Sequence, residues 1–303
     1  MTHKYKNNFT FLNLMKTGNK LWIDLKKILR NFPIIRNNHR RILKSILSLK
    51  ESVVGTPSSI KVIEKDWDFL IVLDACRYDL FEDNNFIEGE LKKINSAGSS
   101  TVEWIKNNFK GDQSDVVVVS SNPHLSDLRL KDILGKNPFC HIEDVWDYGW
   151  DDELKTVPPW AVNEGVKKVI KKHPDKKFII HYMQPHFPFI GEHRIVHTGI
   201  ETLRRRGKEK IINKGEERNP WDDLADGKIG LEDFMKAYSD NLILVLKHVR
   251  KLLPELDGNV VITSDHGNCI GEMGLHSHPG GFHIKPLIEV PWLVVDKRRI
   301  AKN

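Results

Sequence analysis

Five short apolar runs are spread over the last 240 residues of the chain and predict buried β-strands. They include the segments FLIVL, VVVV, FII, VVIT and WLVV, and they lie within residues 67–75, 115–121, 177–183, 259–265 and 290–296. A run of four to eight apolar residues without polar alternation is typical of a strand that is covered on both faces.

Amphipathic stretches with a helical period lie between these runs, at residues 100–109, 161–173 and 237–253. In the last stretch Leu242, Val245, Leu246 and Val249 fall on one face. Strands alternating with helices predict an α/β fold, with a central, largely parallel sheet and helices on both of its faces. In such a sheet the ligand site lies beyond the carboxyl ends of the strands.

Two segments depart from this alternation. Residues 1–55 have the pattern of a basic amphipathic helical segment, and GTPSS at residues 55–59 is typical of a linker to the α/β domain of residues 60–303. Residues 192–232 are polar, charged and rich in glycine, so we expect an insertion over the ligand crevice. Its run Arg204–Arg206 fits either a phosphate contact or a solvated face.

The positive charge is concentrated at the N-terminus. Residues 1–50 contain twelve Lys and Arg residues and the single acid Asp24, a net charge of +11, so the other 253 residues carry −5 of the total of +6. A helix pair lying on an anionic membrane surface and a helix pair packed on the domain both fit this pattern. We expect no nucleic-acid binding, because no aromatic interleaving or known module accompanies the charge.

Cysteine content and hydropathy set the expected compartment. No apolar run approaches the roughly 20 residues that cross a bilayer. The short apolar part of MTHKYKNNFTFLNLMK is interrupted by asparagine, which argues against a secretory signal. Three cysteines are too few for a disulfide framework. We therefore expect a cytoplasmic protein, with association to a membrane as an open alternative.

The candidate chemistry lies at the ends of two predicted strands. DFLIVLDACR places Asp74, and NVVITSDHG places Asp265 and His266, directly after apolar runs. A buried carboxylate is unfavourable unless it is paired. Two carboxylates and an imidazole form a suitable ligand set for a divalent cation such as Zn²⁺, Mn²⁺, Mg²⁺ or Ca²⁺.

Further histidines follow strand ends. In KFIIHYMQPHFPF we interpret His181 as a packed histidine within the strand, and we favour His186, between prolines in the next loop, for function. The segment after His266 contains four more candidate groups, which fit a polar loop or a loop that returns to the crevice: Glu272, His276, His278 and His283.

Hydroxyl-bearing residues lie at the start of the first helix predicted within the α/β domain. In NSAGSSTVEW, Ser100 and Glu103 have the spacing of a capping box. The alternative is that Ser100 or Thr101 acts as a nucleophile at a helix N-terminus, activated by a bound metal ion.

Together these segments resemble the alkaline phosphatase superfamily, specifically its sulfatase-like hydrolase branch. The resemblance covers about residues 60–300 and rests on the order of IVLDACRYD, AGSSTVEW, HYMQPHFPF, AYSDNLILVL, VVITSDHGNCIGEMG and EVPWLVV. It implies an alkaline phosphatase-like fold and a catalytic domain in residues 60–303.

The resemblance also implies roles for particular residues. Asp74, Asp265 and His266 would bind a divalent metal cation together with the nucleophilic hydroxyl, which falls on Thr101, with Ser100 second. The substrate-binding positions would be His186, His278 with His276 as its near alternative, and Arg77 of the first motif.

This sequence departs from the family pattern in two places. The sulfatase signature Cys-x-Pro-x-Arg is absent, which argues for phosphate rather than sulfate esters. Asn268 stands where relatives often have an acid, so a complete second metal site is not expected.

We therefore expect a metal-dependent hydrolase or transferase that forms a covalent phospho-enzyme with a phosphorylated small molecule, lipid or glycan. The alternatives are a sulfuric ester hydrolase and a non-catalytic membrane- or glycan-associated binding module with the same fold.

Overall fold

The computed structural model describes residues 58–195, 200–209 and 219–296. Near the N-terminus it also describes Arg41, Leu43, Lys44, Ser45 and Leu47, which are helical. The rest of the predicted N-terminal segment, and residues 196–199 and 210–218 of the predicted insertion, lie outside the described residues.

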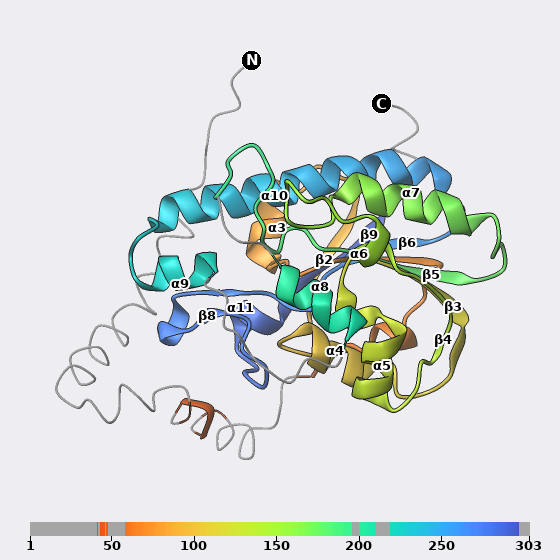
Figure 1. Ribbon diagram of the computed structural model, residues 1–303, viewed down its shortest axis with the longest axis horizontal. Coiled ribbons are helices and arrows are strands. Elements are labelled where there is room, and N and C mark those ends of the chain that lie inside the picture. Colours follow the sequence, from red (N-terminus) through yellow and green to blue (C-terminus); the bar gives the residue numbers. More distant parts are fainter. Residues whose placement is uncertain are drawn as a thin grey trace.

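A seven-stranded sheet forms the centre of the molecule, in the order β2-β9-β6-β1-β5-β3-β4 (Figure 1). Strands β6, β1, β5, β3 and β4 are parallel to one another, and β9 runs antiparallel to both of its neighbours. The largely parallel α/β sheet is confirmed. The strands are β1 (Phe69–Leu73), β2 (Gly89–Asn95), β3 (Gln113–Ser120), β4 (Phe139–Glu143), β5 (Lys177–Tyr182), β6 (Val260–Thr263) and β9 (Glu289–Val295).

Helices cover both faces of this sheet, as Figure 1 shows. Because side chains alternate along a strand, β1 contributes to two apolar clusters. Ile71 belongs to the cluster shared with α3 (Tyr78–Asn84), α7 (Pro159–Ile170) and α10 (Leu231–Leu252), and Leu70 belongs to the cluster shared with α4 (Thr101–Asn108) and α5 (Asp127–Leu134). The apolar face predicted for residues 237–253 is the buried face of α10.

Strands β2 and β4 were not predicted. The sequence of β2, GELKKIN, lies at an edge of the sheet and is mostly exposed, so it lacks an apolar run. The other edge strand, β4, is short and only partly buried. Edge strands need less apolar surface than central ones, and this explains the missing signal.

The remaining elements are short and connect or flank the main layers. The predicted insertion contains α8 (Glu201–Lys208) and α9 (Pro220–Ala225). After β6 the chain forms a small hairpin of β7 (Cys269–Ile270) and β8 (His276–Ser277). The others are α6 (Val145–Tyr148), α11 (Lys285–Ile288), and the 3₁₀ turns η1 (Val62–Glu64), η2 (Pro123–Leu125), η3 (Leu253–Glu255) and η4 (Glu272–Gly274).

Part of the N-terminal segment packs on the domain. Leu43 is buried against Leu275, Phe282 and Leu287, which belong to the region after β7. Of the helices in the described part of the chain, not one has the length and apolar character that a bilayer crossing requires.

Candidate active site

The three predicted metal ligands meet where two central strands end. Parallel pairing puts Val72 of β1 beside Thr263 of β6, so the segments that follow the two strands leave the sheet together. Nε2 of His266 lies 3.8 Å from Oδ1 of Asp74 and 3.3 Å from Oδ2 of Asp265. All three residues are buried, with at most 2% of their surface exposed.

Gly267 allows the chain to pass close to the backbone of Pro286 directly after these ligands. A Cβ atom at this position would lie 2.2 Å from the carbonyl oxygen of Pro286. The Gly267 N–H instead donates to the carbonyl of Leu287 at 2.8 Å. The glycine of the sequence SDHG is therefore required by close backbone packing beside His266.

The hydroxyl of Thr101 lies against this cluster. Thr101 is the first residue of α4, and its Oγ1 donates to Oδ2 of Asp265 at 2.7 Å and lies 3.3 Å from Nε2 of His266. Ser100 is the N-cap residue and has no hydrogen bond to either group within the described ranges. Of the two predicted nucleophiles, Thr101 has the closer contact with the predicted ligands.

Of the two interpretations of this segment, the capping box of Ser100 and Glu103 is wrong. Glu103 accepts hydrogen bonds from the backbone N–H of Ser99 at 2.9 Å and from its Oγ at 2.7 Å. The Oγ of Ser99 in turn accepts from the N–H of Gly281 at 2.9 Å, and Nε2 of His283 lies 2.9 Å from Glu103. The carboxylate thus serves a tertiary contact that ties the histidine-rich loop to the start of α4.

Two more predicted histidines lie next to the cluster. The ring centroid of His278 is 4.4 Å from that of His266 and 5.1 Å from that of His186. His276 lies on β8 and is not among the residues that line the pocket described below. The structure therefore brings His186 and His278, rather than His276, to the site.

The three clustered imidazoles share one hydrogen-bonding arrangement. Nδ1 of His266 and Nδ1 of His186 lie 2.8 Å and 2.6 Å from the carbonyl of the following residue. Nδ1 of His278 lies 2.8 Å from Oδ1 of Asn268. These oxygens only accept, so each Nδ1 carries a proton and Nε2 is the ring nitrogen that is left for a metal ion or a ligand. This is the form in which histidine binds metal ions.

Burial keeps two of these rings neutral. Burial, together with the charge of His266, lowers the pKa of His186 to about 4. Burial, with the charges of His266 and His186, also lowers the pKa of His278 well below its usual value. Near pH 7 both imidazoles are uncharged and can donate or accept hydrogen bonds at the pocket surface.

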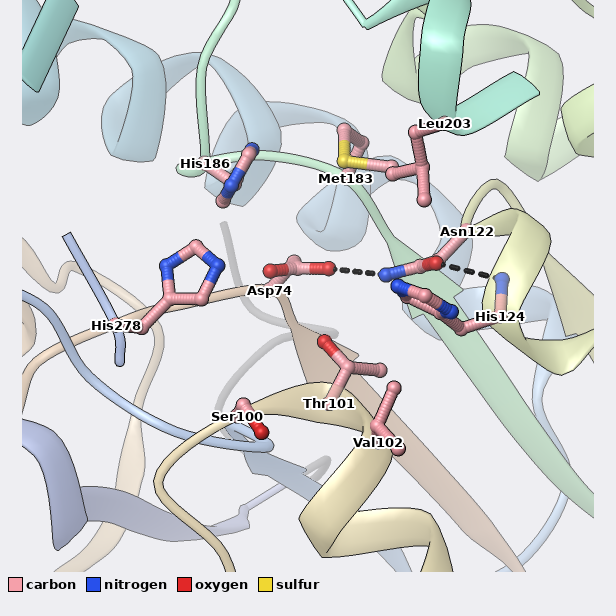
Figure 2. A pocket seen from close by; sticks show the side chains of 10 residues that line it. All are labelled: Asp74, Ser100, Thr101, Val102, Asn122, His124, Met183, His186, Leu203 and His278. Atoms are coloured by element: carbon pink, nitrogen blue, oxygen red, sulfur yellow. Dashed lines mark hydrogen bonds between the residues drawn. The ribbon is translucent and has the colours of Figure 1, made fainter. Parts of the chain in front are cut away.

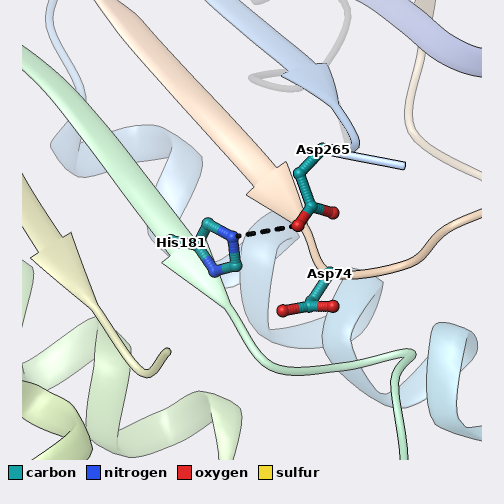
Figure 3. Close-up of side chains that lie close together, drawn as sticks. All are labelled: Asp74, His181 and Asp265. Carbon is teal, nitrogen blue, oxygen red and sulfur yellow. Dashed lines mark ion pairs between the residues drawn. The ribbon is translucent and has the colours of Figure 1, made fainter. Parts of the chain in front are cut away.

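His181 is a member of the site that the sequence interpretation treated as packed. It is fully buried, its Nε2 lies 3.8 Å from Oδ2 of Asp265, and neither ring nitrogen has a hydrogen-bond partner. Figure 3 shows its ring, on β5, facing Asp74 and Asp265. Each of these three residues offers one potential metal-ligand atom, and the three atoms lie within 4.8 Å of one another. The available signal was an imidazole at the end of an otherwise apolar strand.

The two carboxylates have opposite pKa shifts. Burial and the charge of Asp265 raise the pKa of Asp74 well above its ordinary value. Burial acts in the same direction on Asp265, but His266 and His181 outweigh it and lower its pKa. Two carboxylates buried together, beside a histidine whose ring nitrogens lack a hydrogen-bond partner, fit a divalent cation, because the charge of the cation would neutralise the carboxylates.

A cavity of about 190 Å³ opens onto this cluster (Figure 2). Asn122, His124, Met183 and Leu203 line it and were not predicted. Asn122 follows β3 at the same sheet edge, and its amide donates to Oδ2 of Asp74 at 2.6 Å. The other lining residues are Asp74, Ser100, Thr101, Val102, His186 and His278.

The arginines that the sequence analysis named make contacts within the protein. Arg77 pairs with Asp79 and with Glu272, both at 2.6 Å, and donates to the carbonyl of Asn268 at 3.0 Å. These contacts tie the segment after β1 to the segment after β7, and Arg77 does not line the pocket. Its role in substrate binding remains a prediction. In the insertion, Arg204 stacks on Trp150.

The fold matches known enzymes although the sequence does not. No family model matches this chain, and comparison with curated proteins found no match. The soluble domain of lipooligosaccharide phosphoethanolamine transferase A from Neisseria meningitidis has a TM-score of 0.50 and 17% identity, covering 77% of this chain and 78% of that domain. The corresponding integral membrane protein has a TM-score of 0.50 and 16% identity; the match covers 95% of this chain and 61% of that protein.

A third structure has lower similarity: the C-terminal periplasmic domain of phosphoethanolamine transferase EptC from Campylobacter jejuni, with a TM-score of 0.48 and 15% identity over 77% of this chain and 80% of that domain. Together with the sheet order, the first two matches confirm the alkaline phosphatase-like fold that the sequence motifs predicted. The cytoplasmic location remains a prediction.

Proposed function

We propose that this protein is a metal-dependent phosphoester transferase or hydrolase in which Thr101 is the nucleophile. The observation that carries this proposal is the contact of the Thr101 hydroxyl with Asp265 and His266, in a buried site at the carboxyl edge of the sheet. The missing sulfatase cysteine motif favours phosphorus over sulfur, and the fold neighbours are named as phosphoethanolamine transferases.

The residues that would hold the divalent cation are Asp74, Asp265, His266 and the hydroxyl of Thr101, with His181 beside them. A bound divalent cation lowers the pKa of a coordinated hydroxyl and neutralises charge that develops on phosphoryl oxygens. Asn122 keeps the carboxylate of Asp74 oriented through its 2.6 Å hydrogen bond.

The side chains around the pocket have defined tasks in this reaction. Asp265, whose pKa is lowered, orients the hydroxyl of Thr101 through its hydrogen bond. As Oγ1 forms a bond to phosphorus and the bond to the leaving oxygen breaks, the proton of Thr101 is transferred to the leaving oxygen. The start of α4 directs backbone N–H groups toward the phosphoryl group. Neutral His186 and His278 lie across the pocket from Thr101 (Figure 2). In this reaction they contact the outer oxygens of the phosphoryl group. A water or an acceptor hydroxyl then releases Thr101.

Substitution of the two hydroxyl residues tests the nucleophile. With Mn²⁺ or Zn²⁺ and a 4-nitrophenyl phosphodiester, we expect Thr101→Ala to lower kcat by about 10³-fold or more, and Ser100→Ala to have a much smaller effect. Intact-mass analysis should detect phosphorylated wild-type protein and none in Thr101→Ala. Wild-type turnover by the Thr101→Ala, Ser100→Ala double variant would refute the covalent mechanism.

Metal analysis separates the proposal from its alternatives. Protein purified without chelators should contain a divalent cation that is lost in Asp265→Asn. Protein that binds no cation would instead be a non-catalytic module. Release of sulfate but not phosphate from paired esters would identify a sulfuric ester hydrolase.

A further inference from the structure

The pocket has a second wall, opposite the histidines of the catalytic cluster. Figure 2 shows His186 and His278 on one side of Asp74, and His124, Asn122 and Leu203 on the other side. His124 belongs to η2, and Leu203 comes from α8 in the insertion, which packs on η2. We call His124, Val102, Met183 and Leu203 the substituent wall, because a group attached to the phosphorus of a substrate bound at Thr101 would lie against it.

The substituent wall is apolar except for one unpaired imidazole. Val102, Met183 and Leu203 offer only apolar contacts. Nδ1 of His124 is buried without a hydrogen-bond partner, and no hydrogen bond to its Nε2 is formed by any described residue. A polar group without a partner is unfavourable at a cavity wall, and a ligand hydroxyl would pair with Nε2 of His124, because Nδ1 is enclosed by the protein.

The electrostatics of this wall disfavour a cation. Burial, together with the charges of Arg129 and Arg206, lowers the pKa of His124 to about 3, so its ring is neutral near pH 7. Among the described residues that line the pocket, Asp74 is the one carboxylate. It already faces Asn122 and the metal-ligand cluster. The nearby charges of Arg206 and of Arg129, which also pairs with Asp132 at 3.1 Å, would therefore disfavour an ammonium group at the substituent wall, where no described lining residue supplies a second carboxylate to pair with it.

We propose that the organic group on phosphorus is a short, uncharged, hydroxyl-bearing substituent such as glycerol, and that His124 recognises its hydroxyl. This inference rests on the proposed phosphoester function. The size of the cavity agrees with it, because 190 Å³ is below the roughly 300–1,000 Å³ of pockets for drug-sized ligands. The phosphate and a short organic group fit this space, and the rest of a larger phosphoester substrate would remain outside it.

Three matched substrates test the proposal: 4-nitrophenyl phosphodiesters whose second group is glyceryl, propyl or 2-aminoethyl. We expect wild-type kcat/KM to be at least about tenfold higher for the glyceryl ester than for the 2-aminoethyl ester. Equal or faster cleavage of the 2-aminoethyl ester would overturn the inference while leaving the phosphoester function intact.

Two variants and one control assign the preference to the substituent wall. Leu203→Asp supplies the missing carboxylate. It should change the ratio of kcat/KM for the glyceryl ester to kcat/KM for the 2-aminoethyl ester by at least about tenfold in favour of the 2-aminoethyl ester. His124→Phe should bring the glyceryl and propyl esters to similar kcat/KM values. Arg205→Gln, on the exposed side of the same helix, changes the net charge as Leu203→Asp does and should leave all ratios unchanged. If Leu203→Asp changes no ratio although it melts like the wild type, the wall does not set specificity.

A binding measurement keeps the two proposals separate. Calorimetric titration should show that glycerol 1-phosphate binds at least about tenfold more tightly than O-phosphoethanolamine. If no ester is cleaved and no phospho-enzyme forms, the phosphoester function fails, whereas equal binding of the two phosphates refutes the substituent preference by itself.

Discussion

Two neighbouring aspartates show how the partner of a carboxylate decides its effect on stability. Asp74 is buried beside Asp265, whose charge repels it. Its carboxylate accepts a hydrogen bond from the amide of Asn122 and lies 3.8 Å from Nε2 of His266. Asp79 pairs with the buried guanidinium of Arg77 at 2.6 Å, which holds the pKa of Asp79 below its usual value. Without a cation, the first carboxylate therefore opposes folding and the second supports it.

Asp74→Asn should separate stability from metal binding. In EDTA at pH 7 we expect its free energy of unfolding to exceed that of the wild type by about 1–2 kcal/mol, because one of two repelling carboxylates is removed. Urea denaturation measures this. On addition of Mn²⁺ or Zn²⁺ the wild type should gain thermal stability and Asp74→Asn should not.

Asp79→Asn is the matched control, and it should lower stability in EDTA because Arg77 loses a charged partner. A loss of stability in Asp74→Asn comparable to that in Asp79→Asn would contradict the view that repulsion dominates the empty site.

At the level of elements, helix α10 positions a catalytic loop through one polar residue on its buried face. Asn241 is fully buried, its amide donates to the carbonyls of Pro185, His186 and Pro188, and its oxygen accepts from the N–H of Ile190. One side chain thus contacts four backbone groups of the loop that follows β5, with its two amide hydrogens shared among three carbonyls. The loop holds His186 at the pocket because this helix residue replaces the missing backbone partners.

Asn241→Ala should therefore loosen this loop. We expect a loss of about 2–4 kcal/mol in the free energy of unfolding, because buried backbone groups lose their partners. Faster hydrogen exchange confined to the loop after β5 would identify the cause. Asn95→Ala is the control, because Asn95 is only partly buried and its amide makes a single hydrogen bond, to Ser58. Equal losses in the two variants would contradict this role.

The central strands and helices were predictable from sequence, whereas the polar residues that hold the loops in place were not, because only the former have a local pattern. Strands β1, β3, β5, β6 and β9 and the face of α10 carry their signal locally, in the spacing of apolar residues. Asn241 is more than 50 residues from its partners in sequence, and the same holds for Glu103 and His283. A polar residue on a helix has no periodicity that reveals which distant backbone it satisfies.

At the scale of the molecule, the site divides into a predictable and an unpredictable half. In a parallel sheet the ligand site lies at the carboxyl ends of the strands, and on this basis the sequence alone predicted that Asp74, Asp265 and His266 lie together. His124 and Leu203 depend on where η2 and α8 lie relative to the sheet, and local pattern does not determine the position of an insertion.

The basic N-terminal segment gives a prediction at the same scale. Residues 1–39 contain eight Lys and Arg residues and one Asp, so the full chain should co-sediment with vesicles containing phosphatidylserine. Each basic residue near an anionic surface contributes about 1 kcal/mol. Removal of residues 1–39 should lower the bound fraction at least about tenfold, and it keeps Leu43, which packs on the domain.

Phosphatidylcholine vesicles provide the control for charge, and 0.5 M salt should weaken binding to the anionic vesicles. If the shortened protein sediments equally well with phosphatidylserine vesicles, the segment is not a membrane anchor.

The origin of α8 has a consequence for how this protein can change. The groups proposed to carry out bond formation belong to the sheet and α4, whereas Leu203 reaches the cavity from a segment that interrupts the α/β order. Replacement of that segment would leave the strand ends in register. A library restricted to residues 200–208 should therefore yield catalysts with new headgroup preferences and an unaltered reaction.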